Sequence, residues 1–320
     1  MEFELIKKLV EYCDKRFFGK KLHYNITSNG TLLTEEIIRY LERHEIHLMV
    51  SLDGPKDIND MNRVFADGRG TFDTVMEKLH LIGKVSPEYA KTLSLSMVMD
   101  PVNDFDCINE ISVDYNELQI ATLSAALVDK EYDQESPEFS EEYSSKFEYQ
   151  MFLAILSHFG RFPKEEVSPI AKQGVTNILS DAIRLQLGSP MRQEGAPGGP
   201  CVPGKMRLFC NVDGNLYPCE RVSETSPAMK IGSLQEGFNL DNARKLLNIG
   251  MLTENICREC WSFRLCTTCA KKADVGTDAL SIKQKLLCCN SVRNVAYSKL
   301  FNAICMKEIP IYYHEQLWRK

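Results

Sequence analysis

Long hydrophobic runs are missing from this sequence of 320 residues. A helix that spans a bilayer needs about 18 or more consecutive apolar residues, and the longest apolar stretch, residues 120–128, is interrupted by Thr122 and Ser124. Residues 1–17 follow an amphipathic helix pattern with charges of both signs, whereas a secretory signal has a basic start and an apolar middle. We therefore expect a cytoplasmic protein that has no membrane partner.

Excess positive charge is also missing. The formal net charge is −6 and the sequence pI is about 5.7, so the chain lacks the basic surface that nucleic acid requires. The sequence has no internal repeats and no low-complexity tract. Its hydrophobic content of 44% is sufficient for a sizeable core, and its length accommodates two domains.

Cysteine, in contrast, is abundant, with 12 residues. Disulfides are reduced in the cytosol, so these thiols need another role. Cys13, Cys107 and Cys305 stand alone and are expected to be free, buried thiols. The other nine lie within residues 201–289 and are Cys201, Cys210, Cys219, Cys257, Cys260, Cys266, Cys269, Cys288 and Cys289.

Residues 1–128 alternate between helix and strand patterns. Such alternation is typical of βα units with a parallel sheet, and the sequence therefore predicts an α/β fold with four parallel strands. Thr34 precedes two glutamates and is the expected N-cap of the second helix. The helices are predicted at 3–15, 34–43, 71–82 and 105–118, and the strands at 22–27, 47–51, 93–99 and 120–128.

Two further parts follow. Residues 129–196 are predicted to form a helical bridge, with two helices separated by FGRFPKEE, and a linker rich in Gly and Pro. In residues 197–320, Asp213-Gly214-Asn215 lies between two short strand patterns and indicates a hairpin. A loop-rich cysteine region comes next, and a closing helix is predicted at 282–304.

The spacing of the cysteines indicates a metal site. Twelve residues, Gly214 and four more residues separate Cys201 from Cys219, and two C-x-x-C pairs lie five residues apart within CRECWSFRLCTTC. Paired C-x-x-C motifs most often hold zinc. One zinc ion uses only four thiolates, however, and nine cysteines suffice for two iron–sulfur clusters. From spacing alone, zinc and iron–sulfur are equally good interpretations.

The complete pattern resembles the seven-cysteine SPASM domain of radical SAM peptide-modifying enzymes. RLFCNVDGNLYPCER and KIGSLQEGF resemble the hairpin of that domain and the segment after it. TSNGTLL, LMVSLDGP, the pair Asp60 and Arg63, and GRGTFDTV are similar to the later half of a radical SAM partial barrel. The sequences of these motifs are most similar to those of maturases that install thioether bridges in cysteine-rich ribosomal peptides. The resemblance implies a partial (β/α) barrel, a helical bridge and a SPASM domain, with a cysteine-rich precursor peptide as substrate.

The resemblance also implies two auxiliary [4Fe–4S] clusters. Cys201, Cys219 and Cys269 would hold the first cluster, with Cys210 as its fourth ligand or with an iron left open to a substrate thiolate. Cys289 is an alternative to Cys288 in the second cluster, because neighbours on a helix point about 100° apart. The ligands implied for the second cluster are Cys257, Cys260, Cys266 and Cys288.

The sequence departs from this family in one respect that concerns the chemistry. Radical SAM enzymes cleave SAM at a cluster held by a C-x-x-x-C-x-x-C loop, and these 320 residues contain no such spacing. We interpret the chain as an N-terminally truncated half-barrel maturase that does not cleave SAM alone. S-adenosyl-L-methionine would be a cofactor only if a second chain supplied the missing half-barrel.

The SAM side of the site is expected where predicted strands end. By resemblance, Asn29 and Ser51 would face SAM, with Asp53 beside them, and Arg63 would pair with a carboxylate in a bidentate manner. SNG and DGP are also ordinary turn sequences, and a surface arginine is usually solvated, so a purely structural role remains open for each residue.

Two other functions are also considered. Anaerobic sulfatase-maturating enzymes oxidise Ser or Cys to formylglycine, and an Asp after the hairpin cysteine is their presumed base. Glu220 holds that place here; it could act as a general base or be a solvated surface residue. This departure favours the thioether interpretation. The other possibility is a non-catalytic iron–sulfur or zinc protein that binds a cysteine-rich peptide.

Overall fold

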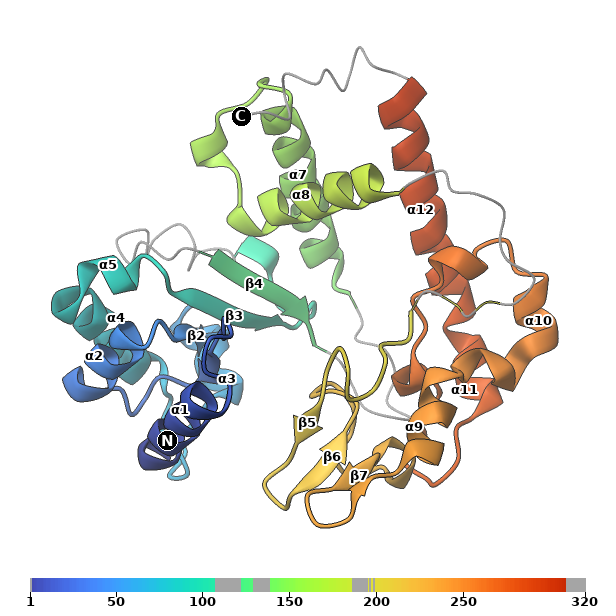
Figure 1. Ribbon diagram of the computed structural model, residues 1–320. Helices are drawn as coiled ribbons and strands as arrows, with labels where there is room; N and C mark the ends of the chain where they lie inside the picture. Colours follow the sequence, from blue (N-terminus) through green and yellow to red (C-terminus); the bar gives the residue numbers. More distant parts are fainter. Residues whose placement is uncertain are drawn as a thin grey trace. The chain divides into compact units, whose positions relative to one another are not determined.

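The computed structural model describes residues 2–106, 122–128, 139–185, 195, 197 and 199–308 (Figure 1). The chain divides into two compact units. The first contains Met1–Asp129 and Ser136–Thr176, and the second contains Lys130–Glu135 and Asn177–Lys320. The predicted domain boundaries at 128 and 196 stay predictions. Most of the predicted helix at 105–118, including Cys107, lies outside the described residues.

The first unit is built on a parallel sheet of four strands. Their order in the sheet is the order in the sequence, and every neighbouring pair is parallel, which confirms the predicted α/β character. In the register, Ser28 lies beside Val50 and Ser51 beside Ser96. The strands are β1 (Asn25–Ser28), β2 (His47–Ser51), β3 (Ser94–Met99) and β4 (Thr122–Leu127).

Helices connect these strands and bury their apolar sides in one core, which includes Leu41, Val50 and Leu79. The predicted N-cap is confirmed, because the Thr34 hydroxyl accepts a hydrogen bond from the Ile37 amide at 3.3 Å. Two short helices were not predicted: one follows the segment DGP, which was interpreted as a loop, and the other follows the helix predicted at 71–82. The helices are α1 (Phe3–Arg16), α2 (Glu35–Arg43), α3 (Lys56–Asn62), α4 (Phe72–Val85) and α5 (Pro87–Ala90), of which α3 and α5 are the unpredicted ones.

The predicted helix pair after the sheet is present. α7 (Glu141–His158) and α8 (Pro169–Arg184) are separated by the turn that contains Gly160 and Pro163. Ser140 caps α7 through its hydroxyl, which accepts from the Tyr143 amide at 3.0 Å. Among the described residues, none of the helices combines the length and the apolar character that crossing a membrane requires.

The second unit has a small antiparallel sheet followed by short helices. The predicted hairpin is formed by β5 (Phe209–Cys210) and β6 (Asn215–Tyr217), and Gly214 in its turn has a φ of 77°, where glycine is favoured. The sheet continues with β7 (Gly232–Ser233) and β8 (Gly237–Phe238). Its apolar core includes Leu216, Met229 and Ile249. The helices are α9 (Leu240–Leu247), α10 (Glu254–Arg258), α11 (Ile282–Leu287) and α12 (Cys289–Glu308).

The closing helix requires a correction. One continuous helix was predicted at 282–304, but the structure has two, α11 and α12, which are divided at Cys288. The amide of Cys288 donates to the carbonyl of Leu286 instead of the carbonyl four residues back, so the α-helical ladder is interrupted there. As a result, the two adjacent cysteines at this junction have different surroundings.

Candidate functional site

A small pocket in the second unit is lined by four thiols. Cys257 lies on α10, Cys260 just after it, Cys266 after a following 3-10 turn, and Cys289 at the start of α12. The pocket encloses about 30 Å³. The rest of its wall is largely apolar and includes Pro197, Ile249, Ile256, Phe263 and Val292. Residues 257–266 and the start of α12 thus bring four sulfur atoms around one space.

Hydroxyl groups and cations surround these sulfur atoms. The Thr253 hydroxyl lies 3.2 Å from Cys257 Sγ, and the Ser262 hydroxyl lies 3.3 Å from Cys260 Sγ. Partial burial alone would raise the pKa of Cys260, but hydrogen bonds from Ser262 and Arg293 lower it below its usual value. Lys285 Nζ is 3.7 Å from Cys257 Sγ. The site therefore favours thiolate at Cys260 and has a cation beside each of two thiols.

The adjacent cysteines at the helix junction differ in their contacts. Cys289 lines the pocket, and its pKa is raised by burial and by the neighbouring thiols Cys288, Cys257 and Cys266. Cys288 is not among the lining residues. Its Sγ donates to the carbonyl of Lys285 at 2.9 Å and lies 3.6 Å from the Thr268 hydroxyl. Of the two, Cys289 shares the pocket with Cys257, Cys260 and Cys266.

A second group of cysteines gathers near the hairpin. Arg207 pairs with Glu220, which is the main reason that the pKa of Arg207 is raised, and the thiols of Cys219 and Cys201 raise it further. These two cysteines therefore lie near the same guanidinium. Cys210 is exposed, and its Sγ donates to the carbonyl of Asn211 at 3.6 Å.

Gly199 lies against the backbone of the two residues that precede Cys269. A Cβ on Gly199 would lie 2.4 Å from the carbonyl carbon of Thr267 and 2.7 Å from the carbonyl oxygen of Thr268, so the two backbones are in direct contact. Cys201 and Cys269 follow these contacting residues closely in the sequence.

Within the described ranges, no three His, Cys, Asp or Glu side chains converge as ligands of a single metal ion.

Substituting Gly199 with alanine should therefore disturb the cysteines near the hairpin, Cys201 and Cys219, and Cys269. The new Cβ cannot fit against the backbone of residues 267–268, so the two segments must move apart. We expect Gly199→Ala to bind clearly less iron than the wild type after anaerobic reconstitution, measured as iron per chain. Gly195→Ala is the matched control, because a Cβ there meets nothing within 4 Å. Equal iron binding by both variants would contradict this role of Gly199.

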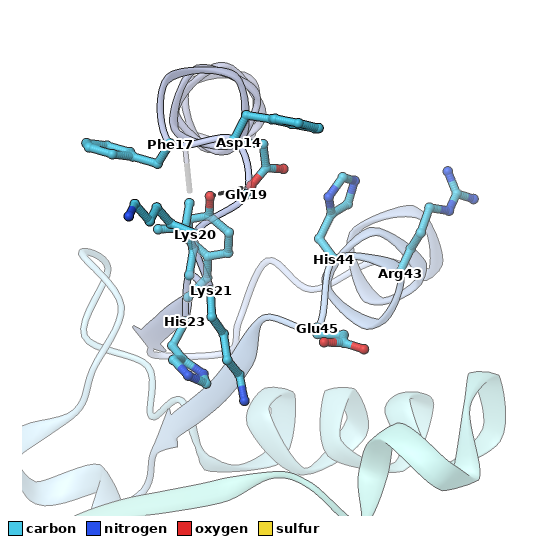
Figure 2. A pocket seen from close by; sticks show the side chains of 12 residues that line it. Asp14, Phe17, Gly19, Lys20, Lys21, His23, Arg43, His44 and Glu45 are labelled. Atoms are coloured by element: carbon cyan, nitrogen blue, oxygen red, sulfur yellow. Dashed lines mark hydrogen bonds between the residues drawn. The ribbon is translucent and has the colours of Figure 1, made fainter.

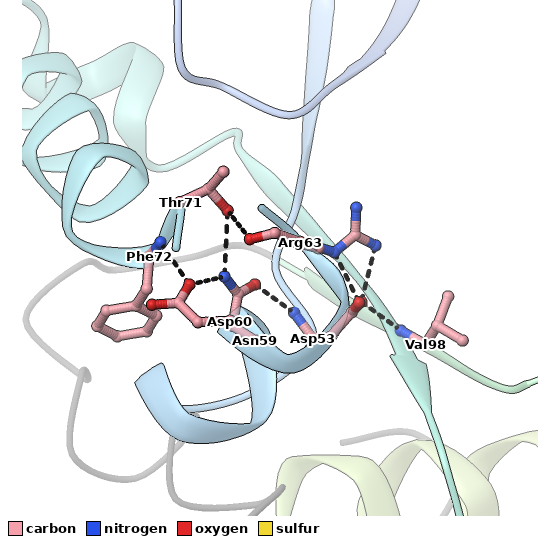
Figure 3. A network of polar contacts seen from close by, with 7 residues as sticks. All are labelled: Asp53, Asn59, Asp60, Arg63, Thr71, Phe72 and Val98. Carbon is pink, nitrogen blue, oxygen red and sulfur yellow. Dashed lines mark hydrogen bonds and ion pairs between the residues drawn. The ribbon is translucent and has the colours of Figure 1, made fainter. Parts of the chain in front are cut away.

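Asp53 and Arg63 form a bidentate ion pair in the first unit (Figure 3). Arg63 Nε donates to Asp53 Oδ2 at 2.6 Å, and Arg63 Nη2 donates to Asp53 Oδ1 at 2.8 Å. Asp53 Oδ1 also accepts from the amide of Val98, on β3, at 2.9 Å. Because Asp53 follows β2 and Arg63 ends α3, the pair ties the loop after one strand to a helix and to the next strand.

A second set of hydrogen bonds holds the start of α4 against α3 (Figure 3). Asp60 Oδ1 accepts from the amide of Phe72 at 2.9 Å and from Asn59 Nδ2 at 3.0 Å. The Thr71 hydroxyl donates to the carbonyl of Arg63 at 2.9 Å. A Cβ on Gly70 would lie 2.0 Å from an Asp60 carboxylate oxygen, which explains the glycine in GRGTFD. The pair Asp60 and Arg63, noted in the sequence, thus has two separate structural roles.

Asn29 and Ser51 lie at the carboxyl edge of the parallel sheet. Asn29 follows β1, and Ser51 is the last residue of β2. Asn29 Oδ1 accepts from the amide of Thr31 at 3.3 Å and from its hydroxyl at 3.1 Å, so this side chain stabilises its own turn. This edge is where open α/β sheets bind ligands. The two predicted SAM-side residues therefore belong to the same edge, with Asp53 nearby in the sequence.

Another hollow, of about 360 Å³, lies at the opposite end of β1, near the last residues of α1 and α2 (Figure 2). Its lining includes Lys20, Lys21, His23 and Arg43. Figure 2 shows that Lys20, Lys21 and Arg43 extend in different directions, so these cations have no common focus. The hollow contains no residue of the polar network in Figure 3.

Sequence reasoning did not identify the groups that contact the thiols, namely Thr253, Ser262, Lys285 and Arg293. A signal was present, because Lys285 and Arg293 lie four residues before and four residues after Cys289. In helical segments, that spacing places side chains on one face. Cysteine spacing alone does not reveal such neighbours.

Comparisons with known proteins identify relatives of this chain. Residues 1–111 match the model of the radical SAM superfamily. A cysteine-type anaerobic sulfatase-maturating enzyme of Clostridium perfringens (strain 13) is 30% identical over 272 residues, which are 82% of this chain and 68% of the relative. A serine-type anaerobic sulfatase-maturating enzyme of Bacteroides thetaiotaomicron is 23% identical over 276 residues, covering 79% of this chain and 62% of the relative.

Solved structures share the fold. Native anSMEcpe with bound AdoMet and Cp18Cys peptide has a TM-score of 0.61 and 19% sequence identity, with 97% of this chain and 81% of that chain covered. The same fold is therefore present in a protein whose structure contains AdoMet and a peptide. The curated relatives are longer than this chain, which spans 68% and 62% of their lengths.

Proposed function

This chain belongs to the radical SAM superfamily, and from that premise we propose that it acts in the maturation of a cysteine-containing peptide or protein with two auxiliary [4Fe–4S] clusters. The observation that carries the proposal is the gathering of thiols in the second unit. Four thiols from three segments line one pocket, with a hydroxyl or a cation beside two of them. Similarity to anaerobic sulfatase-maturating enzymes supports the maturase class.

The donor set of the thiol pocket fits an iron–sulfur cluster. Thiolates are the usual cluster ligands, and hydrogen bonds and partial burial are the usual means by which a protein tunes a cluster. The ligands we propose are Cys257, Cys260, Cys266 and Cys289, with Cys288 as the alternative to Cys289. When bound, the cluster would supply one-electron transfer.

The cysteines near the hairpin, together with Cys269, would hold the cluster that is not in the thiol pocket. Cys201, Cys219 and Cys269 supply three thiolates, and Arg207 lies near the first two. Cys210 is either the fourth ligand or is replaced there by a thiolate of the substrate. Its exposure and its weak hydrogen bond to Asn211 leave both arrangements accessible.

The SAM side of the site is proposed at the carboxyl edge of the sheet. Asn29 and Ser51 lie at this edge, and the Asp53–Arg63 pair fixes the loop that follows β2. Asp53 takes the Nε hydrogen and one Nη2 hydrogen of Arg63, so Nη1 and the second Nη2 hydrogen are the donors that would meet a further carboxylate. Cleavage of SAM also requires a C-x-x-x-C-x-x-C loop. We propose that a segment outside these 320 residues, in which the spacing does not occur, brings that loop.

The relatives favour one reaction and Glu220 favours another. Similarity to cysteine-type and serine-type sulfatase-maturating enzymes supports oxidation of a Cys or Ser side chain to formylglycine. Glu220, the proposed base of that reaction, pairs with Arg207 and lies 3.6 Å from Arg221. Partial desolvation alone would raise the pKa of Glu220, but hydrogen bonds from its own backbone amide and from Arg207 lower it, and its side chain is 52% exposed. The lowered pKa weakens this carboxylate as a base. That observation supports thioether formation as the second candidate.

A peptide-binding experiment tests the cysteine-containing substrate. Adding a cysteine-containing peptide to the anaerobically loaded, reduced chain should change the electron paramagnetic resonance spectrum of one cluster, because a substrate thiolate binds its open iron. The same peptide with serine in place of cysteine should cause no change. Identical spectra with and without the cysteine peptide would contradict the proposal. Mass spectrometry of the peptide, after a chain with the C-x-x-x-C-x-x-C loop is supplied, distinguishes formylglycine from a thioether.

A further inference from the structure

Lys285 is a buried cation inside the thiol pocket. Its residue exposure is 3%, and it projects from α11. Its Nζ donates to the hydroxyl of Thr253 and lies 3.7 Å from Cys257 Sγ. The Thr253 hydroxyl is itself 3.2 Å from the same sulfur. The ammonium, the hydroxyl and the thiol therefore form a compact triangle on one side of the pocket.

Among the described residues, no carboxylate bonds to this ammonium. The partners recorded for Lys285 Nζ within the described part of the chain are the Thr253 hydroxyl and the Cys257 thiol. A buried ammonium normally requires an anion, since desolvation disfavours an unpaired charge. Lys285 therefore has no anionic partner among the neutral groups that contact it. Deprotonated thiols around it would supply the negative charge.

We propose that Lys285 is a positioning residue that raises the reduction potential of the cluster in the thiol pocket and helps to retain it; this inference rests on the proposed function. Four thiolates on a [4Fe–4S]²⁺ core carry a net charge of −2, and one-electron reduction makes it −3. A cation favours the more negative, reduced form. Lys285 is buried, whereas the guanidinium of Arg293 is partly exposed, so the field of Lys285 is less screened by solvent.

A merely structural role for Lys285 predicts a different outcome. If the lysine only held α11 against Thr253, its removal would destabilise the cluster-free protein and leave the potential of the remaining cluster unchanged. If the unpaired ammonium is costly without a cluster, its replacement by an uncharged side chain of similar length should leave the cluster-free protein at least as stable. The two roles therefore differ in the sign of the stability change and in the potential.

The experiment compares the full-length chain with three variants. Lys285→Met removes the charge, Lys285→Arg retains it, and Lys283→Met is the matched control on an exposed position of α11. Each protein is reconstituted anaerobically, its iron is counted, and both clusters are titrated redox-potentiometrically with detection by electron paramagnetic resonance. The melting temperature of each cluster-free form is measured in parallel.

We expect Lys285→Met to lower the potential of one cluster so that its reduced-to-oxidised ratio at a fixed potential falls at least tenfold, about 59 mV for a one-electron couple. Its loss of iron to a chelator should be several-fold faster, and its cluster-free melting temperature should not fall. Lys285→Arg should restore most of the potential, and Lys283→Met should match the wild type. An unchanged potential, or a lower melting temperature of cluster-free Lys285→Met, overturns the inference. A wild type that binds no iron instead overturns the proposed function.

Discussion

Substituting Cys260 with alanine should remove about half of the iron that the reconstituted chain binds, from about eight to about four atoms per chain. Cys260 is a ligand proposed only for the cluster in the thiol pocket, and its lowered pKa favours the thiolate that binds iron. Cys219→Ala should also remove about four atoms, but from the cluster near Arg207. The spectra of the two variants should therefore be complementary and together reproduce that of the wild type.

Other cysteine variants provide the controls for this experiment. Cys13→Ala and Cys305→Ala should retain about eight irons, because neither residue is a proposed ligand. Comparing Cys288→Ala with Cys289→Ala identifies the fourth ligand of the pocket cluster, and the pocket lining predicts the larger loss for Cys289→Ala. If Cys260→Ala and Cys219→Ala removed the same spectral component, the assignment to two separate clusters would be wrong.

The second large effect is expected for the ion pair in the first unit. Asp53→Asn leaves Arg63 without its bidentate partner and should destabilise the first unit by about 3 kcal/mol, because breaking a largely buried pair leaves an uncompensated charge. The exposed fractions of the two side chains are 27% for Arg63 and 11% for Asp53, so solvent screens only part of this loss. Hydrogen exchange measures the effect. The amide of Val98 donates to Asp53 and should lose more protection than the other amides of the sheet.

An exposed pair in the same unit provides the control. Arg69 and Asp67 are also ion-paired, but the exposed fractions of their side chains are 77% and 53%. Arg69→Met should therefore leave the stability of the first unit nearly unchanged. Similar hydrogen exchange in Asp53→Asn and Arg69→Met would mean that the Asp53–Arg63 pair does not organise the loop after β2.

The regular elements could be predicted where local signals were strong. The strand at 47–51, the Thr34 cap and the Gly214 hairpin have short-range patterns, and the structure agrees with them. The α3 helix was missed because DGP is a turn signal and only seven residues of helix follow it. Its residue Asn59 donates to the hydroxyl of Thr71 and accepts from the amide of Asp53, and a local pattern does not contain these partners outside the helix.

The same distinction applies to the site. Cysteine spacing identified the ligand candidates, because such spacing is a local property. The neighbours of the thiols depend on tertiary contacts. Lys285 and Thr253 are 32 residues apart in the sequence, and the interruption at Cys288 decides which cysteine faces the pocket. Neither feature follows from periodicity.

We propose that the thiols of the second unit hold two iron–sulfur clusters. Analysis of iron, sulfide and zinc in anaerobically purified protein, combined with Mössbauer spectroscopy, tests this claim most directly. We predict about eight irons and about eight sulfides per chain, with the spectrum of [4Fe–4S] clusters. One or two zinc ions per chain, with no sulfide, would contradict the claim and would identify the cysteines as structural zinc ligands.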